Sequence, residues 1–571
     1  MPLVKNSTLC LALTATLAAC GGGGDGAAAF GSGSSSSASA SPDISARSSA
    51  TAPQVAASAA VMVASTPVPP AVDPATLRAS PNAYAGYLGT LTNAFGAVLN
   101  TLTSALGQQP AVAPTVQRAV CGPGSAPETG LQGQVPLADR TSGRSKQGYS
   151  CNLELVGQYQ GEGSTWVNPF FDKCAYMATA FDGIPFKKSQ GVQVVDLSNP
   201  AQPKLSANLT SPAMFAGTWE SLKVNEARGL LGGVAVGPVL AGAFFDVYDL
   251  SQDCAKPKLA NSFSGNLTLP ANVLAHEGNW APDGLTYWSS GLAAGSLTAI
   301  DVRNPKSPQI VYTGTSVITN HGFELSEDGN RMYLTTAFPA GVIILDTSEV
   351  QSRKPVPMVR QVGSVFWNTA GVGQHTIPVS YGGKPYLVAV DEFASEAVKF
   401  IDIADETKPR VVNRVQLEIN LPQHVAERKK DVAGNGLFGY EAHYCSVDRK
   451  TNPTALACGF FQSGVRVMDI RDPLKVKEIA YFNPPAQTGK AAQLPGSEHA
   501  SPTIGAAGFT ASDAGNLSLV TPPGLLQTNA NLTADYCGSP PKFVGSDQLW
   551  VTCQDNGVLV LKFKNAAYPL Q

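Results

Sequence analysis

The histidines of this 571-residue chain are few, and four of the six occupy nearly the same place in a repeating pattern. His321 and His375 each lie five residues before a serine, and His443 lies five residues before an aspartate. His276 is the fourth, six residues before a proline. Histidine is a common metal ligand and a frequent general acid or base near neutral pH. The spacing therefore predicts that these imidazoles serve one shared site.

Carboxylates occupy the corresponding place in other copies of the pattern. Glu220 and Asp535 align with the histidines, and Glu277 follows His276 directly. Imidazoles and carboxylates gathered in this way suit a transition metal, namely Fe, Cu, Mn or Zn. The metal ligands predicted here are His276, His321, His375 and His443. Glu220 or Asp535 would then act as the catalytic acid or base, or as a further ligand.

Such a site would make the protein a metal-dependent oxidoreductase or lyase. Two alternatives stay open. The repeated histidine is also explained as a structural habit of the repeat, in which it caps a strand by a hydrogen bond to its neighbour. A polar site for an anionic or sugar-like ligand is the other alternative. His424 and His499 lie in two insertions, 416–438 and 484–533, where a solvated loop residue is the first expectation and a lid over the site the second.

The elements that must position these residues repeat along the chain from about residue 150. Each copy is a short apolar strand that ends in aspartate and leads into a polar turn with a proline, as in Val342–Asp346. Six copies end at Asp196, Asp249, Asp301, Asp346, Asp402 and Asp469, and a seventh copy, Val558–Lys562, lacks the aspartate. This period and the many turn formers predict an all-β fold, a seven-bladed β-propeller over 150–571.

A spare strand over 153–158 precedes the first copy, whereas the last copy lacks an outer strand. We infer that the N-terminal strand completes the last blade, which would remove the open edges of the ring. In a propeller the inner strand of each blade lines the central channel, and its first residue points at one mouth. The repeated histidines and carboxylates are therefore expected to converge at that mouth.

The strands Val194–Asp196 and Ile344–Asp346 make the chain resemble the LVIVD-repeat family of bacterial surface propellers over about 150–565. The resemblance implies the fold and a place on the cell envelope, but no single activity. Metal on a propeller axis has architectural precedents in the carotenoid-cleavage oxygenases and the selenium-binding-type thiol oxidases. The sequence motifs of those two families are not found here.

The N-terminus reads as an export signal. Lys5 precedes a short apolar run that ends in Leu17–Cys20, and four glycines follow. This pattern resembles a bacterial lipobox, so residues 1–20 are predicted to be a lipoprotein signal peptide with Cys20 as the lipidated residue. Residues 21–80 are expected to form a disordered tether, and 81–149 a short helix and a linker. The protein would thus be lipid-anchored to the outer membrane in the bacterial cell envelope.

Export changes how the cysteines are read. Eight remain after the signal and the lipidated residue, and an even number in an oxidising compartment predicts disulfides. Cys445 with Cys458 and Cys537 with Cys553 occupy matching places in the last two blades, so each pair is predicted to join two strands of one hairpin. The pairing of the other four cysteines stays open, and the absence of a CxxC pair disfavours a zinc ribbon.

Charge limits the partners. The net charge is −3 and only 14% of residues are charged, so a nucleic-acid partner is not expected. The membrane, through the lipid anchor, is the first predicted partner. The alternative to an enzyme is a non-enzymatic surface module that recognises a protein or glycan partner through one propeller face.

Overall fold

The computed structural model describes most of the chain from Thr115 onward, and the structural statements below concern those residues. They are 115–161, 166–178, 191–235, 244–261, 275–291, 295–316, 318–337, 339–367, 372–392, 398–432, 438–487 and 533–570, with the backbone of 509–510 and 518–519. The predicted signal peptide, tether and N-terminal helix lie outside the described residues, as do Cys20 and His499. No helix among the described residues is long and apolar enough to cross a membrane.

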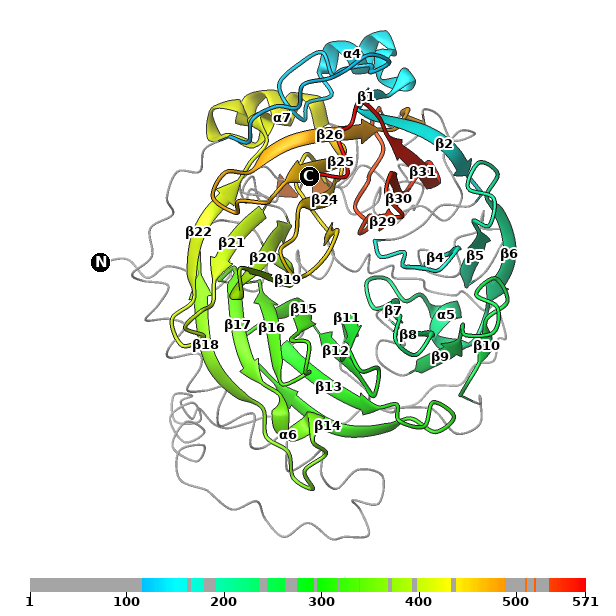
Figure 1. The fold of residues 1–571 in the computed structure, drawn as a ribbon, viewed down its shortest axis with the longest axis vertical. Coiled ribbons are helices and arrows are strands. Elements are labelled where there is room, and N and C mark those ends of the chain that lie inside the picture. Colours follow the sequence, from blue (N-terminus) through cyan, green and yellow to red (C-terminus); the bar gives the residue numbers. More distant parts are fainter. Residues whose placement is uncertain are drawn as a thin grey trace, which may run out of the picture.

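Seven sheets of antiparallel strands stand around a central axis, which confirms the predicted seven-bladed β-propeller (Figure 1). Strands are given from the axis outward. Blade 1 is β3 (Phe170–Phe171), β4 (Cys174–Met177), β5 (Val192–Asp196) and β6 (Lys204–Leu209). Blade 2 is β7 (Lys223–Asn225), β8 (Leu230–Val234), β9 (Phe245–Asp249) and β10 (Lys258–Leu259). Blade 3 is β11 (Ala275–Trp280), β12 (Thr286–Gly291), β13 (Ser296–Asp301) and β14 (Gln309–Thr315).

The other four blades follow the same order. Blade 4 is β15 (Asn320–Leu325), β16 (Arg331–Thr336), β17 (Gly341–Asp346) and β18 (Arg360–Phe366). Blade 5 is β19 (Val372–Tyr381), β20 (Lys384–Glu392), β21 (Val398–Asp402) and β22 (Arg410–Val415). Blade 6 is β23 (Cys445–Val447), β24 (Ala455–Phe460), β25 (Gly464–Asp469), β26 (Lys477–Asn483) and β1 (Tyr149–Cys151). Blade 7 is β29 (Lys542–Val544), β30 (Gln548–Cys553), β31 (Gly557–Phe563) and β2 (Leu153–Tyr159).

Short helices decorate the ring. They are α4 (Leu137–Ser142), η1 (Arg144–Gln147), α5 (Pro212–Ala216), α6 (Ser348–Gln351), η3 (Glu418–Asn420), η4 (Pro422–His424) and α7 (Val425–Val432). In the second insertion, β27 (Phe509–Thr510) pairs with β28 (Ser518–Leu519).

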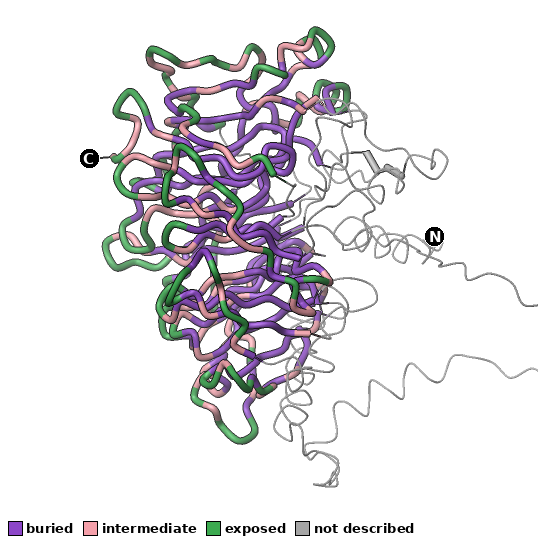
Figure 2. Tube along the Cα trace, turned by 90° about the vertical axis from the view of Figure 1, so that its right-hand side faces the viewer, coloured by how far each residue is buried: buried purple, intermediate pink, exposed green. Residues whose placement is uncertain are grey.

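The core lies between adjacent blades. The third strand of blade 4 is buried from Val342 to Ile344 because both faces of a blade pack against its neighbours. This explains why these strands read as continuous apolar runs rather than as alternating ones. Figure 2 shows the same distribution, with buried chain through the disc and exposed chain at the turns.

The aspartate that ends the third strand in six blades closes the turn after that strand. Asp346 Oδ1 accepts a hydrogen bond from the backbone N–H of Ser348 at 2.9 Å, and Asp402 accepts one from Ala404 at 3.0 Å. The same contact is made by Asp196, Asp249, Asp301 and Asp469. Such Asx turns satisfy a backbone donor, so these repeated aspartates are structural.

The N-terminal strand closes the ring as predicted. β2 pairs antiparallel with β31, with Leu153 opposite Phe563 and Tyr159 opposite Val558. The preceding strand β1 was not predicted, and it pairs with β26 as a fifth strand of blade 6. One short segment therefore covers the outer edges of two neighbouring blades and joins the two ends of the propeller.

The segment before β1, expected as a linker, is packed on the propeller from Thr115 onward. Its Glu128 lies 2.8 Å from the guanidinium of Arg466, which is 1% exposed and also pairs with Glu478 at 3.0 Å. The backbone of Leu137, at the start of α4, donates to Asp431 in α7 at 2.7 Å. These contacts hold α4 beside α7 at the rim of the ring (Figure 1).

Four disulfides cross-link the described part of the chain. The predicted pairs Cys445–Cys458 and Cys537–Cys553 are both present. The first joins β23 to β24 in blade 6, whereas the second joins the segment before β29 to the end of β30 in blade 7. Two further pairs had been left open by the sequence. Cys121–Cys151 fastens the N-terminal segment to β1, and Cys174–Cys254 joins blade 1 to the turn in blade 2.

Candidate metal centre

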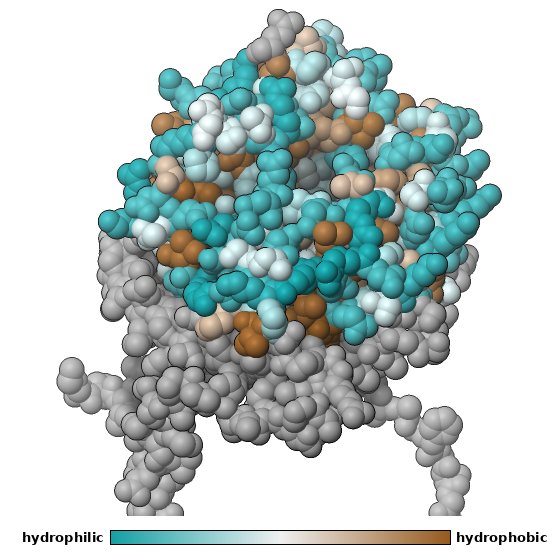
Figure 3. Space-filling view, turned by 60° about the horizontal axis from the view of Figure 1, so that its bottom comes forward, coloured by the Kyte–Doolittle hydropathy of each residue, from teal (hydrophilic) through white to brown (hydrophobic). Residues whose placement is uncertain are grey.

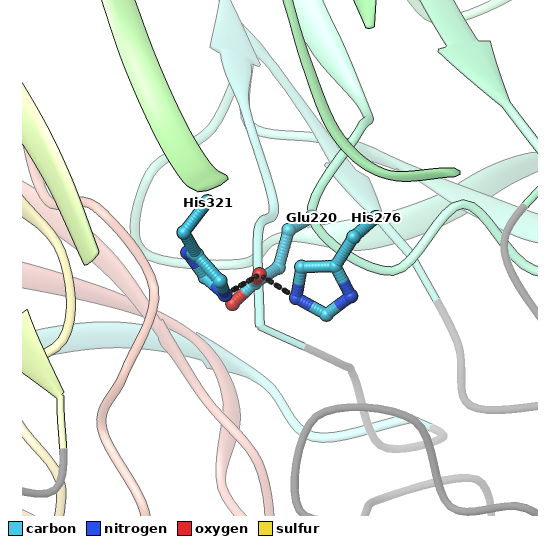
Figure 4. A group of neighbouring side chains, drawn as sticks. All are labelled: Glu220, His276 and His321. Atoms are coloured by element: carbon cyan, nitrogen blue, oxygen red, sulfur yellow. Dashed lines mark ion pairs between the residues drawn. The ribbon is translucent and has the colours of Figure 1, made fainter. Parts of the chain in front are cut away.

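Three imidazoles surround the carboxylate of Glu220 at one mouth of the channel. Figure 4 shows two of them, His276 and His321, on either side of the carboxylate. His276 Nε2 lies 2.6 Å and His321 Nε2 3.5 Å from Glu220 Oε2. His443 Nε2 lies 3.0 Å from Glu220 Oε1, which also accepts a hydrogen bond from the Gln374 side chain at 3.0 Å. Blades 3, 4 and 6 thus meet around a residue that precedes the inner strand of blade 2.

The cluster is sealed from solvent within the described part of the protein. The side chains of Glu220, His276, His321 and His443 are 2%, 4%, 0% and 1% exposed. Aromatic rings border His443, with the Phe461 ring centroid 4.8 Å and the Trp166 centroid 5.5 Å away. A charged carboxylate in such surroundings requires a compensating positive charge close to it.

One extra residue at the start of three inner strands turns these side chains toward the axis. The pairing of β11 with β12 skips His276, that of β15 with β16 skips His321 and Gly322, and that of β19 with β20 skips Gln374. These are β-bulges, which locally break the alternation of a strand and redirect a side chain. In each of these blades a bulge residue is the one that reaches Glu220.

In blade 6 a similar irregularity in backbone pairing orients His443. The backbone N–H of His443 donates to Gly459 O at 2.9 Å, and the N–H of Gly459 donates to Tyr444 O at 2.9 Å. His443 and Tyr444 therefore share one partner residue on β24. Their side chains face opposite ways, because His443 contacts Glu220 while the Tyr444 hydroxyl donates to Glu277 at 2.5 Å.

Backbone carbonyls fix the orientation of two imidazoles. His321 Nδ1 lies 3.1 Å from Gln374 O, and His443 Nδ1 lies 3.1 Å from Gly538 O. A carbonyl oxygen only accepts, so the hydrogen-bond network assigns the proton to Nδ1 in both rings. In the neutral ring of His321, Nε2 then presents a lone pair to Glu220. This is the arrangement in which metal-ligating histidines are usually held.

Burial and charge act on these groups in opposite directions. Burial lowers the pKa of His321 to about 3, which keeps its ring neutral. Burial also lowers the pKa of His443, but Glu220 and Glu392 outweigh it and raise that pKa to about 9. Burial raises the pKa of Glu220, but His276 and the other neighbouring imidazoles together outweigh burial and hold that pKa well below its ordinary value. An ionised carboxylate therefore faces a neutral imidazole at His321.

The spacing of the donors fits a metal ion after small shifts. One ligand atom each from Glu220, His276 and His321 lies within 4.8 Å of the others. Ligands about 2.1 Å from a tetrahedral ion lie roughly 3.4 Å from one another. The contact of Glu220 with His321 already has that length, whereas the contacts with His276 and His443 would have to lengthen by less than about 1 Å.

His375 does not join this cluster. Its Nε2 accepts a hydrogen bond from the backbone N–H of Cys445, 3.0 Å away. The bulge in β19 is the reason, because it gives the position facing Glu220 to Gln374 and turns His375 the other way. Counting residues back from the turn therefore placed His375 one position out of phase.

Asp535 is not brought to Glu220 either. Its carboxylate accepts hydrogen bonds from the backbone of Tyr536 and Asp555 at 2.6 and 2.8 Å, and from the Asn556 side chain at 2.8 Å. Asp535 also lies close to Cys537 and Cys553. These two cysteines form a disulfide, so they supply no thiolate and the group is not a metal site.

The remaining predicted residues are at the edge of the molecule or face the other mouth. His424 ends η4, with its side chain 22% exposed and Nδ1 4.0 Å from Glu427. The backbone of Glu277 forms a β-bridge with that of Glu220, but the Glu277 carboxylate turns away and lies 3.0 Å from Lys223. Two residues that the sequence did not indicate do reach the cluster, namely Gln374 and Glu392, whose Oε1 is 3.6 Å from His443 Nε2. Glu392 ends β20 and carries no repeat signal.

Comparison with known proteins adds little beyond the fold. No protein-family model matches the chain, and no curated protein matches it either. Similar solved structures include the β-propeller domain of Cps50 (Swd1) from Myceliophteria thermophila, at 9% identity over 72% of this chain and 99% of that one, with a TM-score of 0.41. Sqt1 from Saccharomyces cerevisiae has 10% identity over 72% and 98%, also with a TM-score of 0.41.

A candidate 6-phosphogluconolactonase of Bacteroides fragilis has 10% identity over 70% of this chain and 94% of its own, again with a TM-score of 0.41. At such identities and TM-scores, these likenesses carry no argument about activity, ligands or partners.

Proposed function

We propose that the protein binds one transition-metal ion between Glu220, His276, His321 and His443, and that it acts as a metal-dependent oxidoreductase or lyase. The orientation of His321 carries this proposal. Its Nδ1 is committed to Gln374 O, so its Nε2 lone pair points at Glu220 Oε2 at 3.5 Å. Two acceptors that face each other in a buried site repel, and a cation between them turns that repulsion into coordination.

The ligand atoms indicate which metals could bind, and the residues around them indicate what each neighbour would do. Imidazole nitrogen and carboxylate oxygen suit Fe, Mn, Zn or Cu. A bound ion would supply Lewis-acid or redox chemistry. Gln374 orients Glu220 through its hydrogen bond of 3.0 Å. Glu392, near His443, takes the acid–base role in place of Asp535, and burial raises the pKa of Glu392 so that it keeps a proton to higher pH.

Metal content tests the proposal directly. Tag-free protein is stripped with a chelator, dialysed, reloaded separately with Fe(II), Mn(II), Zn(II) or Cu(II), and analysed by mass spectrometry. We expect one ion per chain, and clearly less than one in the His321→Ala and His443→Ala variants. His424→Ala, which removes an imidazole at the rim, is the matched control and should load fully. Failure of all four metals to load the wild-type protein would refute the site.

We also infer that the chain is an exported lipoprotein of the LVIVD-repeat type, anchored through Cys20 at the outer membrane. Residues 1–20 support this inference, as do four disulfides in the described part of the chain, since disulfides persist in oxidising compartments. Intact mass spectrometry of the membrane fraction should detect a lipid on Cys20. A Cys20→Ser variant that stays membrane-bound with an unchanged mass would contradict the anchor.

A further inference from the structure

A second polar site lies on the axis, at the mouth opposite the metal cluster. The inner strands all run in the same direction, so their last residues meet at that mouth. A pocket of about 470 Å³ opens there, lined by Lys223, Glu277, Glu324, Tyr444, Asp448 and Phe543 among others. Its volume falls within the range of about 300–1,000 Å³ that is typical of small-molecule sites. None of Glu220, His276, His321 and His443 lines it.

The floor of the pocket is a buried polar group that the metal centre does not use. Glu277 is 1% exposed, and its Oε1 accepts hydrogen bonds from Lys223 at 3.0 Å and from the Tyr444 hydroxyl at 2.5 Å. The other oxygen, Oε2, is buried and has no hydrogen-bond partner among the described residues. Gly322 makes room for it, since a Cβ there would lie 2.5 Å from Oε2. Lys223, with 16% of its side chain exposed, is the charged group of the floor that is open to a ligand.

The charges around the pocket are already paired within the chain. Glu226 binds Lys542 at 2.6 Å at the rim, and Glu324 binds Lys450 at 2.6 Å. With Glu277 and Lys223, three ion pairs thus border the space. An anionic or cationic ligand would have to break one of these pairs. A hydroxyl group can instead donate to the carboxylate and accept from the ammonium without separating them.

Apolar surface borders the same space. Phe543 and Pro540 are partly exposed in the lining, and the buried residues Phe170 and Pro541 line the same pocket. Flat apolar faces beside paired donors and acceptors suit a ring that carries hydroxyl groups on its edge and C–H groups on its faces. The outer surface in Figure 3, by contrast, is mostly hydrophilic, with hydrophobic side chains in small scattered groups.

We infer that this mouth binds a neutral saccharide, with hydroxyl groups bridging Lys223 and Glu277 and a sugar face against Phe543. The inference goes beyond the metal centre and does not depend on it. Each element of the site is carried by a different blade: Lys223 by blade 2, Glu277 by blade 3, Tyr444 by blade 6 and Phe543 by blade 7. The site therefore exists only in the closed ring.

Saturation-transfer NMR on chelator-treated protein tests the inference without the metal. The probes are D-glucose, D-galactose, N-acetyl-D-glucosamine and maltose, with gluconate and choline as the charged arms. We expect saturable transfer to at least one neutral sugar at concentrations of about 10 mM or lower. No transfer to any of the four sugars, or tighter binding of gluconate or choline, would overturn the inference.

Variants locate the binding. The double variant Lys223→Met with Glu277→Gln removes both charges of the floor together, so it leaves no buried charge unpaired. It should weaken sugar binding at least about tenfold. The control is Lys354→Met, which breaks the 3.1 Å contact of Lys354 with Glu349 of α6. Neither residue lines the pocket, so this variant should bind sugar as the wild type does. Circular dichroism checks that each variant is folded. Tyr444→Phe, which removes only a hydroxyl, is a second variant of the floor, and its sugar binding is measured in the same way. Unchanged binding in both floor variants would place the sugar elsewhere and contradict the inference.

Discussion

The backbone N–H of Cys445 donates a hydrogen bond to the Nε2 atom of His375, 3.0 Å away. The bond joins the inner strands of blades 5 and 6 and occupies the ring atom that a metal would need. Burial lowers the pKa of His375 well below its ordinary value, so the ring stays neutral and keeps the lone pair that accepts this bond. His375 is therefore a structural acceptor, although it shares its place in the repeat with His321 and His443.

Metal uptake should separate His375 from His321. His321→Ala removes a ligand and should lower metal affinity by about 10–100-fold or more. His375→Ala should leave metal affinity unchanged but lower the free energy of unfolding by about 1–3 kcal/mol, because it strands the buried N–H of Cys445. Competition with a chromophoric chelator measures the first quantity, and denaturant unfolding the second. Equal loss of metal in both variants would return His375 to the ligand set.

Part of the decrease in the free energy of unfolding at acidic pH should come from Glu349. Slight burial raises its pKa, but hydrogen bonds from Arg360, the N–H of Met358 and Lys354 outweigh burial and hold the pKa at about 2, against an ordinary value of 4.5. The stabilisation is fully present above pH 4.5 and is lost as the pH falls toward 2. Glu349→Gln should therefore lower the free energy of unfolding at pH 7 and make little difference near pH 2. A wild-type-to-variant difference that is the same at both pH values would contradict this assignment.

Disulfides that close long and short loops should differ in how much they add to the free energy of unfolding. Cys174–Cys254 closes a loop of 80 residues, whereas Cys445–Cys458 closes one of 13. In the chain-entropy description, their removal lowers the free energy of unfolding by about 4.5 and about 3 kcal/mol. Double serine variants of each pair, compared by denaturant unfolding, measure the difference. A larger loss from the short loop would show that native packing, not chain entropy, decides the effect.

Closure of the ring should be sensitive to Gly157 in β2. A Cβ at this position would lie 2.0 Å from Pro200 O in blade 1, so Gly157→Ala must push the closing strand away from its neighbour. We expect a loss of about 1–3 kcal/mol in the free energy of unfolding. Glu154→Ala, an exposed substitution in the same strand, is the control and should stay within about 0.5 kcal/mol. Equal stabilities of the two variants would mean that blade 1 yields to the added methyl group.

The fold could be predicted from the sequence because the third strand of each blade and the turn that follows it have similar residues in every copy. The closing strand could be predicted because the last copy of the repeat lacks an outer strand and a spare strand precedes the first copy. Strand β1 and the packed segment from Thr115 could not, since their contacts, such as Glu128 with Arg466, depend on residues more than three hundred positions away. Local sequence carries no sign of such pairings.

The site was only partly readable for a different reason. Counting from the turn assumes one residue per ladder position, and the bulges at His276, His321 and Gln374 break that assumption. A bulge is visible in strand pairing but leaves no mark in residue types. Three of the four histidines were thus located at the correct mouth, while the residue of blade 5 that completes the cluster proved to be Gln374 and not its neighbour His375.

Neighbouring residues in blades 3, 5 and 6 serve opposite ends of the channel, which leaves one peptide unit between the two ends. The pairs are His276 with Glu277, Gln374 with His375, and His443 with Tyr444. A peptide unit is rigid and planar, so a rotation that reseats one side chain tilts the next. If binding at one end were to shift the backbone, the shift would reach the other end through these three peptide units. Any resulting change in affinity would by thermodynamic reciprocity be equal in both directions.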